Sequence, residues 1–425
     1  MSRNILVISY YFPPTPGVGG RRWAKFVKYL SKDPSTNIFV VSCTNTVKEK
    51  VSSYGDDLKG VDFKHIFFSP RYPLYMQNME FPRRTIIARI GFRFQRLATM
   101  LLAKGNYYDY TVFWKSYFKN EVPALINKNN IDTIIISGPP FRYVYYCLEI
   151  KKKYNNVQIV LDCRDPWCDP NHPPVMSLRR HNFESGAEKI VLESVDKILA
   201  VSNFQKKMLE QKSDSIAPVF VLRNGLDLSD IPTNLEKKNP DDTTIRIAHF
   251  GVMHATKDYY WMPFVEAIKI LKTRKPELFE RLELDFIGLC PEIVLTALRK
   301  TGVKVNAFGL MDIDNAYRKL NLADIVLWFK YDGSAGDFAT KFGDYIALKK
   351  FIWTFSVEGE VTEHIEENEI GKVFYRSDPH LEETILNEML QLDNPDLRIF
   401  DVNYKAESLE LTSLTKSLFD ILYPG

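Results

Sequence analysis

The chain has 425 residues, 45% of them hydrophobic and 26% charged, which is enough for two or three globular domains. Its 56 basic and 53 acidic residues leave a net charge of +3, which excludes the general attraction of a strongly basic protein to nucleic acid, so no nucleic-acid partner is expected. Five scattered cysteines are typical of a reducing compartment, and no apolar run reaches the roughly 18 residues needed to cross a bilayer. These features predict a cytoplasmic protein.

Short β-branched and aromatic runs alternate with helical stretches along the chain, a pattern that predicts βα units and parallel sheets covered on both faces. The strands predicted from these runs are 5–9, 38–42, 65–68, 133–137, 158–163, 197–202, 245–250, 282–287, 303–308, 325–329 and 351–355. Two separate sheets fit this order better than one sheet of eleven strands. The charged segment 235–244, broken by Pro240, has the composition of a linker. We therefore predict α/β domains over residues 1–234 and 235–404.

A loop rich in glycine and proline follows the first predicted strand, over residues 11–20, and leads into a helix that runs to about residue 30. Its backbone N–H groups and the positive end of the helix would let a phosphate or a sugar hydroxyl approach closely. The loop lacks the G-x-G-x-x-G spacing of a dinucleotide site and the lysine of a Walker motif. A proline–glycine turn without a ligand is the alternative interpretation.

Two further loops follow predicted strands of the first half: Gly-Pro-Pro-Phe at 138–141, and Arg164-Asp165-Pro-Trp after strand 158–163. Ligands of open parallel sheets bind at the carboxyl ends of strands, so Arg164 and Asp165 are candidate site residues, with a structural ion pair as the alternative. The nearby Cys163, Cys168, Asp169 and His172 match no familiar zinc spacing, and no metal site is predicted.

In the second half, Gly251 ends a predicted strand and Lys257 follows six residues later. The glycine permits close approach to a diphosphate, and the lysine supplies a positive charge for it. A predicted helix begins near Thr340, where its first turn could present N–H groups to phosphate, and Asp344 could accept hydrogen bonds from ribose hydroxyls. Each of these signals is weak when taken alone.

The segment from Arg83 to Lys104 contains six basic residues and no acidic one, with apolar residues at three- and four-residue steps between them. This pattern fits an amphipathic helix that lies on an anionic membrane surface. A helix packed on its own sheet, with a solvated basic edge, is an equally favoured interpretation.

The order of short motifs along the chain resembles bacterial glycosyltransferases of family 4, particularly those of cell-surface polysaccharide synthesis. The motifs are Y-F-P-P, G-x-G-G-x-R-W, G-P-P-F, R-D-P-W, V-S-N-F, R-N-G-L-D, F-G with a later lysine, and K-F-G-D-Y-I-A. The resemblance implies the GT-B fold: an acceptor-binding and a nucleotide-sugar-binding Rossmann-like domain facing a cleft, and a C-terminal helix at 409–422, within a segment 405–425 that returns to the first domain. It also implies metal-independent transfer with retention of configuration and no cofactor beyond the nucleotide sugar.

The resemblance also implies roles for individual residues. In the N-terminal loop, Gly19 would meet the donor phosphate and the acceptor, next to Gly20, and Arg22 would close the loop. Lys257 would contact the donor diphosphate, and Asp344 takes the place of the second glutamate of the E-x7-E motif, which usually binds ribose. Arg164 and Asp165 fall near the family's active-site histidine.

Two positions depart from the family pattern. Val252 stands where the family has an arginine, and Gly336 where it has the first glutamate of E-x7-E. The leading hypothesis is a glycosyltransferase acting on a glycan or lipid-linked acceptor of capsule, O-antigen or lipopolysaccharide synthesis, on the inner membrane face. Lys257, Lys341 and the helix start at Thr340 would stabilise the departing diphosphate. A sugar-nucleotide epimerase and a catalytically inactive binding subunit are the alternatives.

Overall fold

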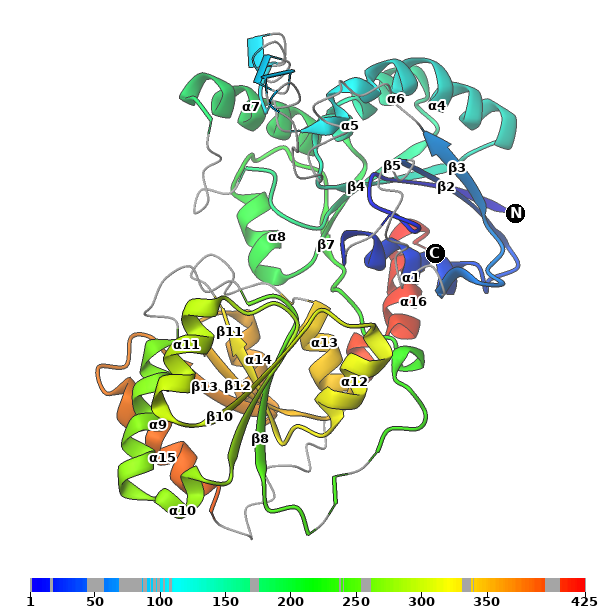
Figure 1. The fold of residues 1–425 in the computed structure, drawn as a ribbon. Helices are drawn as coiled ribbons and strands as arrows, with labels where there is room; N and C mark the ends of the chain where they lie inside the picture. Colours follow the sequence, from blue (N-terminus) through cyan, green and yellow to red (C-terminus); the bar gives the residue numbers. More distant parts are fainter. Residues whose placement is uncertain are drawn as a thin grey trace. The chain divides into compact units, whose positions relative to one another are not determined.

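The computed structural model describes residues 2–15, 18–43, 57–68, 104–106, 109–168, 176–236, 238–239, 241–253, 261–330, 338, 340–393 and 406–424, with 86, 90–91, 93–94, 97 and 100–101 in a helical segment. The chain forms two compact units, Met1–Arg223 with Leu414–Gly425, and Asn224–Ser413. Each unit contains one parallel sheet with helices on both faces (Figure 1).

The sheet of the first unit has the strand order β3-β2-β1-β4-β5-β6-β7, with every neighbouring pair parallel. Its strands are β1 Arg3–Ser9, β2 Thr36–Cys43, β3 Lys64–Phe68, β4 Thr133–Gly138, β5 Gln158–Cys163, β6 Lys197–Ala200 and β7 Val219–Val221. The chain order reverses between β1 and β4, and the loops at this point are where doubly wound sheets bind ligands.

Helices cover both faces of this sheet, because central strands such as β1 bury apolar side chains on either side. Figure 1 shows α4, α5, α6 and α7 on one face and α1 and α16 on the other. Their bounds are α1 Arg21–Leu30, α4 Lys115–Asn129, α5 Arg142–Tyr145, α6 Cys147–Lys153, α7 Leu178–Ser194, α8 Asn203–Glu210 and α16 Leu411–Leu422. The C-terminal helix returns to the first unit as expected, since the Tyr423 hydroxyl lies 3.0 Å from Thr133 Oγ1 and the Arg3 guanidinium stacks on the Tyr423 ring.

The second unit has the order β10-β9-β8-β11-β12-β13, again all parallel. Its strands are β8 Ile245–Phe250, β9 Leu282–Ile287, β10 Lys304–Gly309, β11 Ile325–Phe329, β12 Phe351–Ser356 and β13 Gly371–Tyr375. One apolar core lies under α9 Met262–Arg274, α10 Pro276–Phe279, α11 Glu292–Thr301 and α15 Leu381–Gln391, and another under α12 Ile313–Asn321, α13 Thr340–Ala347 and α14 Glu360–Glu367.

All eleven predicted strands coincide with observed ones, and two strands were missed, β7 and β13. Both lie at a sheet edge, where pairing on one side only leaves a short and partly exposed run. The second unit begins at Asn224, eleven residues before the predicted boundary. Leu226 already donates its N–H to the Leu409 carbonyl of that unit at 2.9 Å, and Ile231 packs on its core. No helix within the described part of the chain is long and apolar enough to span a bilayer.

Candidate functional site

The loop after β1 folds back onto the loop after β5. A Cβ added at Gly19 would lie 3.0 Å from Arg164 Nη1 and 3.2 Å from the Tyr11 ring, so a larger residue would push these loops apart. Gly20 is the residue that precedes α1, and it is buried. Gly19 therefore serves the contact between the two loops, whereas Gly20 packs on the Phe12 backbone of its own loop. The predicted meeting of these glycines with a phosphate or an acceptor stays a prediction.

Arg164 joins three strand-end loops of the first sheet. Its guanidinium donates to the Gly19 carbonyl and, at 3.1 Å, to the Pro139 carbonyl, and it lies 5.8 Å from the Tyr11 ring centre. The side chain of Arg164 is only 12% exposed, so these contacts hold it in a fixed position. The loops after β1, β4 and β5 consequently form one connected edge.

Asp165 lies beside this junction with its carboxylate accessible. Its Oδ2 is 3.8 Å from Arg164 Nε, and 61% of its side chain is exposed. Burial of the loop raises the pKa of the Asp165 carboxyl, and the positive charge of Arg164 opposes that rise. Most of the side chain contacts water, which screens both effects. Asp165 is the accessible carboxylate that an acceptor hydroxyl could meet here.

Arg22 forms a buried ion pair with Asp162 at the end of β5. Its Nη2 lies 2.9 Å from Asp162 Oδ1, and the same guanidinium donates to the carbonyls of residues 222 and 223 at 2.9 and 3.0 Å. Asp162 also accepts from Trp23 Nε1 and Ser137 Oγ, both at 2.7 Å. Arg22 thus connects α1, the sheet and the end of the first unit's main segment. Its predicted role as the residue that closes the ligand loop stays a prediction.

In the second unit, Gly251 follows β8 with a φ of +88°, a left-handed conformation that favours glycine. Among the described residues, no heavy atom lies within 4 Å of the position that a Cβ would take there. A ligand could therefore come close to this backbone. The next residue, Val252, is 43% exposed. Lys257 lies outside the described residues, as does Gly336.

Helix α13 begins at Thr340 and carries Lys341 in its first turn. Burial lowers the pKa of Lys341 to about 8. Within the described part of the chain no hydrogen bond or ion pair reaches its ammonium group, so nothing there offsets the cost of burying the charge. A cation at a helix N-terminus, where the backbone N–H groups also point outward, attracts an anion.

Asp344, one turn further along α13, is turned toward the interior of the unit. The residue is only 7% exposed, and its Oδ1 accepts a hydrogen bond from the Tyr317 hydroxyl of α12 at 2.8 Å. This contact ties the two helices together. The predicted contact of Asp344 with ribose hydroxyls stays a prediction.

Two cations that sequence reasoning missed lie at the same edge of the second sheet. Lys330 follows β11 and is 2% exposed. Its backbone N–H donates to the Phe355 carbonyl at the end of β12. Arg376 follows β13, and its N–H donates to the Ser356 carbonyl at 3.1 Å. Lys330 could have been identified from the sequence, because this residue comes directly after the predicted strand 325–329. Arg376 follows a strand that was not predicted.

No protein-family model matches the chain, and no curated protein matches its sequence. Among solved structures, HepE from Anabaena in complex with UDP and glucose is similar over 99% of each chain, with a TM-score of 0.62 and 11% identity. WaaG, a glycosyltransferase involved in lipopolysaccharide biosynthesis, is similar over 99% of this chain and 100% of its own (TM-score 0.57, 14% identity). A putative UDP-N-acetylglucosamine 2-epimerase from Listeria monocytogenes is similar over 99% and 96% (TM-score 0.56, 11% identity).

At these identities the similarity concerns the fold. The chain has the GT-B fold, with two Rossmann-like domains built on parallel sheets of seven and six strands. This confirms the predicted α/β fold class. The same fold serves transferases and an epimerase, so the choice between these activities depends on the chemistry of the site.

Proposed function

We propose that this protein is a glycosyltransferase that moves a sugar from a nucleotide diphosphate donor to a glycan or lipid-linked acceptor in surface polysaccharide synthesis. The observation that carries the proposal is Lys341, a largely buried cation without a described partner in the first turn of α13. Among the described residues no atom fills the position that a Cβ of Gly251 would take, and this position belongs to the same unit, at the carboxyl end of β8. A diphosphate is the anion that a Rossmann-like domain binds at such positions.

The printed descriptions of similar structures support the kind of donor and pathway. HepE is described in complexes with UDP and with UDP-glucose, and WaaG in lipopolysaccharide biosynthesis. A UDP-sugar is therefore the donor to test first. Capsule, O-antigen and lipopolysaccharide core are the acceptor classes that we propose.

For the mechanism, we assign the departing diphosphate to Lys341, the N–H groups that begin at Thr340, and Lys257. Charges fixed in advance at the place where negative charge develops in the transition state lower the barrier most. Asp165 would orient the acceptor hydroxyl, next to the junction held by Arg164. Transfer would proceed with retention of configuration and without a metal ion, as the family resemblance implies.

The helical residues between 86 and 101 support a membrane location for this reaction. Five apolar side chains on this segment are between 51% and 74% exposed: Ile86, Ile90, Phe94, Leu97 and Leu101. Their spacing places them along one face of a helix. A helix packed on its own sheet would bury such a face, so the exposure favours the interpretation of Arg83–Lys104 as a segment that contacts an anionic lipid surface.

Titration calorimetry with UDP, GDP and ADP, followed by a transfer assay with the matching sugar nucleotides, tests the proposal. A transferase should bind one of these nucleoside diphosphates, and it should liberate that diphosphate from the matching sugar nucleotide only when an acceptor glycan takes the sugar. Interconversion of UDP-N-acetylglucosamine without an acceptor would instead identify an epimerase, the activity of the Listeria neighbour. A chain that binds no nucleotide would be the inactive binding subunit, and the proposal would be wrong.

A further inference from the structure

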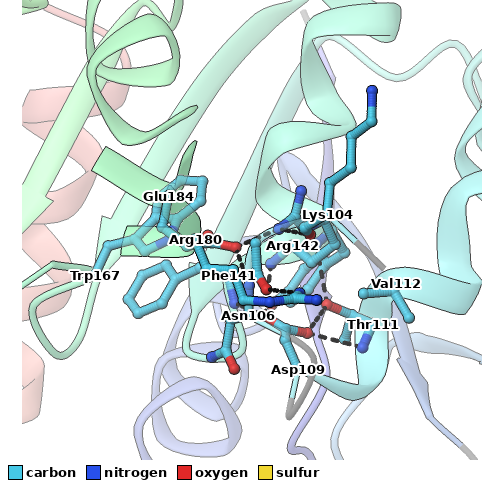
Figure 2. A network of polar contacts seen from close by, with 12 residues as sticks. Lys104, Asn106, Asp109, Thr111, Val112, Phe141, Arg142, Trp167, Arg180 and Glu184 are labelled. Atoms are coloured by element: carbon cyan, nitrogen blue, oxygen red, sulfur yellow. Dashed lines mark hydrogen bonds and ion pairs between the residues drawn. The ribbon is translucent and has the colours of Figure 1, made fainter. Parts of the chain in front are cut away.

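A buried network of polar contacts joins the end of the exposed helical segment to two strand-end loops of the first sheet. Figure 2 shows this network, in which side chains from α5 and α7 converge on the short stretch that follows the segment. Two buried carboxylates accept most of the hydrogen bonds of this network: Asp109, which is 8% exposed, and Glu184, which is 3% exposed. Each of them accepts hydrogen bonds from parts of the chain that are far apart in sequence.

Glu184, on α7, connects three segments through one carboxylate. Its Oε1 accepts from the backbone N–H of Asn106 at 2.6 Å and from the Arg142 guanidinium, and its Oε2 accepts from Trp167 Nε1 at 2.9 Å. Asn106 comes just after the exposed helical segment, and Trp167 belongs to the loop after β5. A shift of the segment would therefore break contacts of the same carboxylate that holds the loop.

Arginines bind the carbonyl groups at the end of the segment. Arg142 donates to the Lys104 carbonyl at 2.9 Å, and Arg180 donates to the carbonyls of Met100 and, at 2.7 Å, of Gly105. A Cβ at Gly105 would collide with Glu184 Oε1, so the chain passes close to the carboxylate. The end of the segment is consequently fixed to α5 and α7.

The second carboxylate, Asp109, holds the loop after β4. It accepts from the backbone N–H groups of Phe141 and Arg142, both at 2.8 Å, and from that of Thr111. The Phe141 ring stacks on Trp167 with a centroid distance of 5.1 Å and an angle of 8° between the planes. The loops after β4 and β5 are therefore in direct contact, and Trp167 lies two residues after Asp165.

We propose that Glu184 and Arg142 are positioning residues that transmit the docking of segment 86–101 on an anionic phospholipid surface to the loop carrying Arg164 and Asp165. The lipid is the occupant of the apolar face because the segment from Arg83 to Lys104 has six basic residues and no acidic one. Docking would restrain the exposed helical residues, and the contacts of Glu184 with Asn106, Arg142 and Trp167 would carry this restraint to the loops. This inference rests on the proposed function and adds to it a reason for acceptor transfer to be fastest at the membrane.

The test uses the full chain with vesicles of phosphatidylcholine that contain phosphatidylglycerol, and vesicles of phosphatidylcholine alone as a control. Amide hydrogen exchange is followed in peptides that cover Asn106, Phe141–Arg142 and Arg164–Trp167. In the wild type, anionic vesicles should slow exchange at all three places by about threefold or more, the response expected when local opening is suppressed. Wild-type protein that ignores these vesicles, or binds them without a change at 141–142 and 164–167, would overturn the proposal.

Variants separate docking from transmission. Trp167→Phe removes the donor to Glu184 and keeps an aromatic ring against Phe141, so vesicle binding should persist while the response of 164–167 is lost. Glu184→Gln should lose the response at both loops. Ile90→Ser with Phe94→Ser should abolish vesicle binding and leave the exchange without vesicles unchanged. A Trp167→Phe protein that still shows the full response at 164–167 contradicts transmission through Glu184.

UDP binding, measured by calorimetry on the same proteins, keeps this test apart from that of the proposed function. The variants lie in the first unit, and we expect each of them to bind UDP like the wild type. Protein that binds UDP and shows no coupling between vesicles and loops overturns the inference alone. Protein that binds no nucleotide overturns the proposed function, whatever the vesicles do.

Discussion

Charged side chains at the carboxyl ends of the strands have different partners in the two sheets. In the first unit, Arg22 and Arg164 each donate to several acceptors of the same unit, and Asp162 accepts from three side chains. In the second unit, Lys341 has no partner among the described residues, and burial lowers its pKa to about 8. A buried charge without a partner is costly unless a ligand supplies the opposite charge. The first edge therefore holds its loops in place, whereas the second favours binding of an anion.

The largest effect is expected when the buried ion pair between Arg22 and Asp162 in the first unit is broken. Asp162→Asn leaves the Arg22 guanidinium buried without its counter-charge, and we expect the free energy of unfolding of this unit to fall by about 3 to 5 kcal/mol. Urea denaturation, followed by hydrogen exchange in β4 and β5, measures it. Lys341→Met is the matched control in the second unit, where no ion pair is lost and stability should change by less than about 1 kcal/mol. Equal losses in the two variants would mean that the two edges do not differ in this way.

Removing the cation of the second edge should change ligand binding instead of stability. Lys341→Ala should weaken UDP binding about tenfold to a hundredfold, because a charge-assisted contact contributes roughly 1.5 to 3 kcal/mol. Calorimetry measures the affinity, and circular dichroism verifies the fold. Lys300→Ala removes the same charge from an exposed position on α11 and should leave the affinity unchanged. If both variants bind UDP like the wild type, Lys341 does not hold the diphosphate.

The accessible carboxylate of the first edge should affect turnover. Asp165→Asn keeps the shape of the side chain and removes the charge that would orient the acceptor, so kcat should fall by at least about tenfold while UDP affinity stays the same. Steady-state kinetics with the identified donor and acceptor give the split between kcat and KM. If the Asp165→Asn protein has the kcat of the wild type, Asp165 has only a structural role beside Arg164.

The fold was readable from the sequence because its central strands are long apolar runs. Strand β1 places Ile5, Leu6, Val7 and Ile8 in consecutive buried positions, as a strand covered on both faces requires. Strand β7 has three residues and β13 begins with Gly and Lys, so neither carries that pattern. Edge strands depend on a neighbour that the local sequence does not reveal.

Parts of the candidate site were readable for the same reason, since Asp165 and Gly251 follow recognisable strands. The partners of these residues were not. Arg22 pairs with Asp162, 140 positions away, and Glu184 is one acid among several on α7 with no motif around it. Contacts of this kind depend on tertiary packing, so the use of Arg22 in an ion pair became visible only in the structure.

The smallest expected effect is a pH dependence of UDP binding, which we expect from Lys341 of the second unit. Burial lowers the pKa of Lys341 to about 8, so the group is mostly charged near pH 7 and about one-tenth charged near pH 9. A bound diphosphate favours the charged form of Lys341, and its terminal phosphate, with a second pKa of about 6, only gains negative charge above pH 7, which cannot itself weaken binding. UDP affinity should therefore fall as the pH rises from about 7 to 9, by up to about tenfold.

Lys341→Arg sharpens this expectation, because a guanidinium stays charged and should make the affinity nearly independent of pH. Calorimetric titrations of both proteins with UDP at several pH values give the two curves. Parallel curves for the wild type and the arginine variant would assign the titrating group to another residue and remove the main reason for placing the diphosphate at α13.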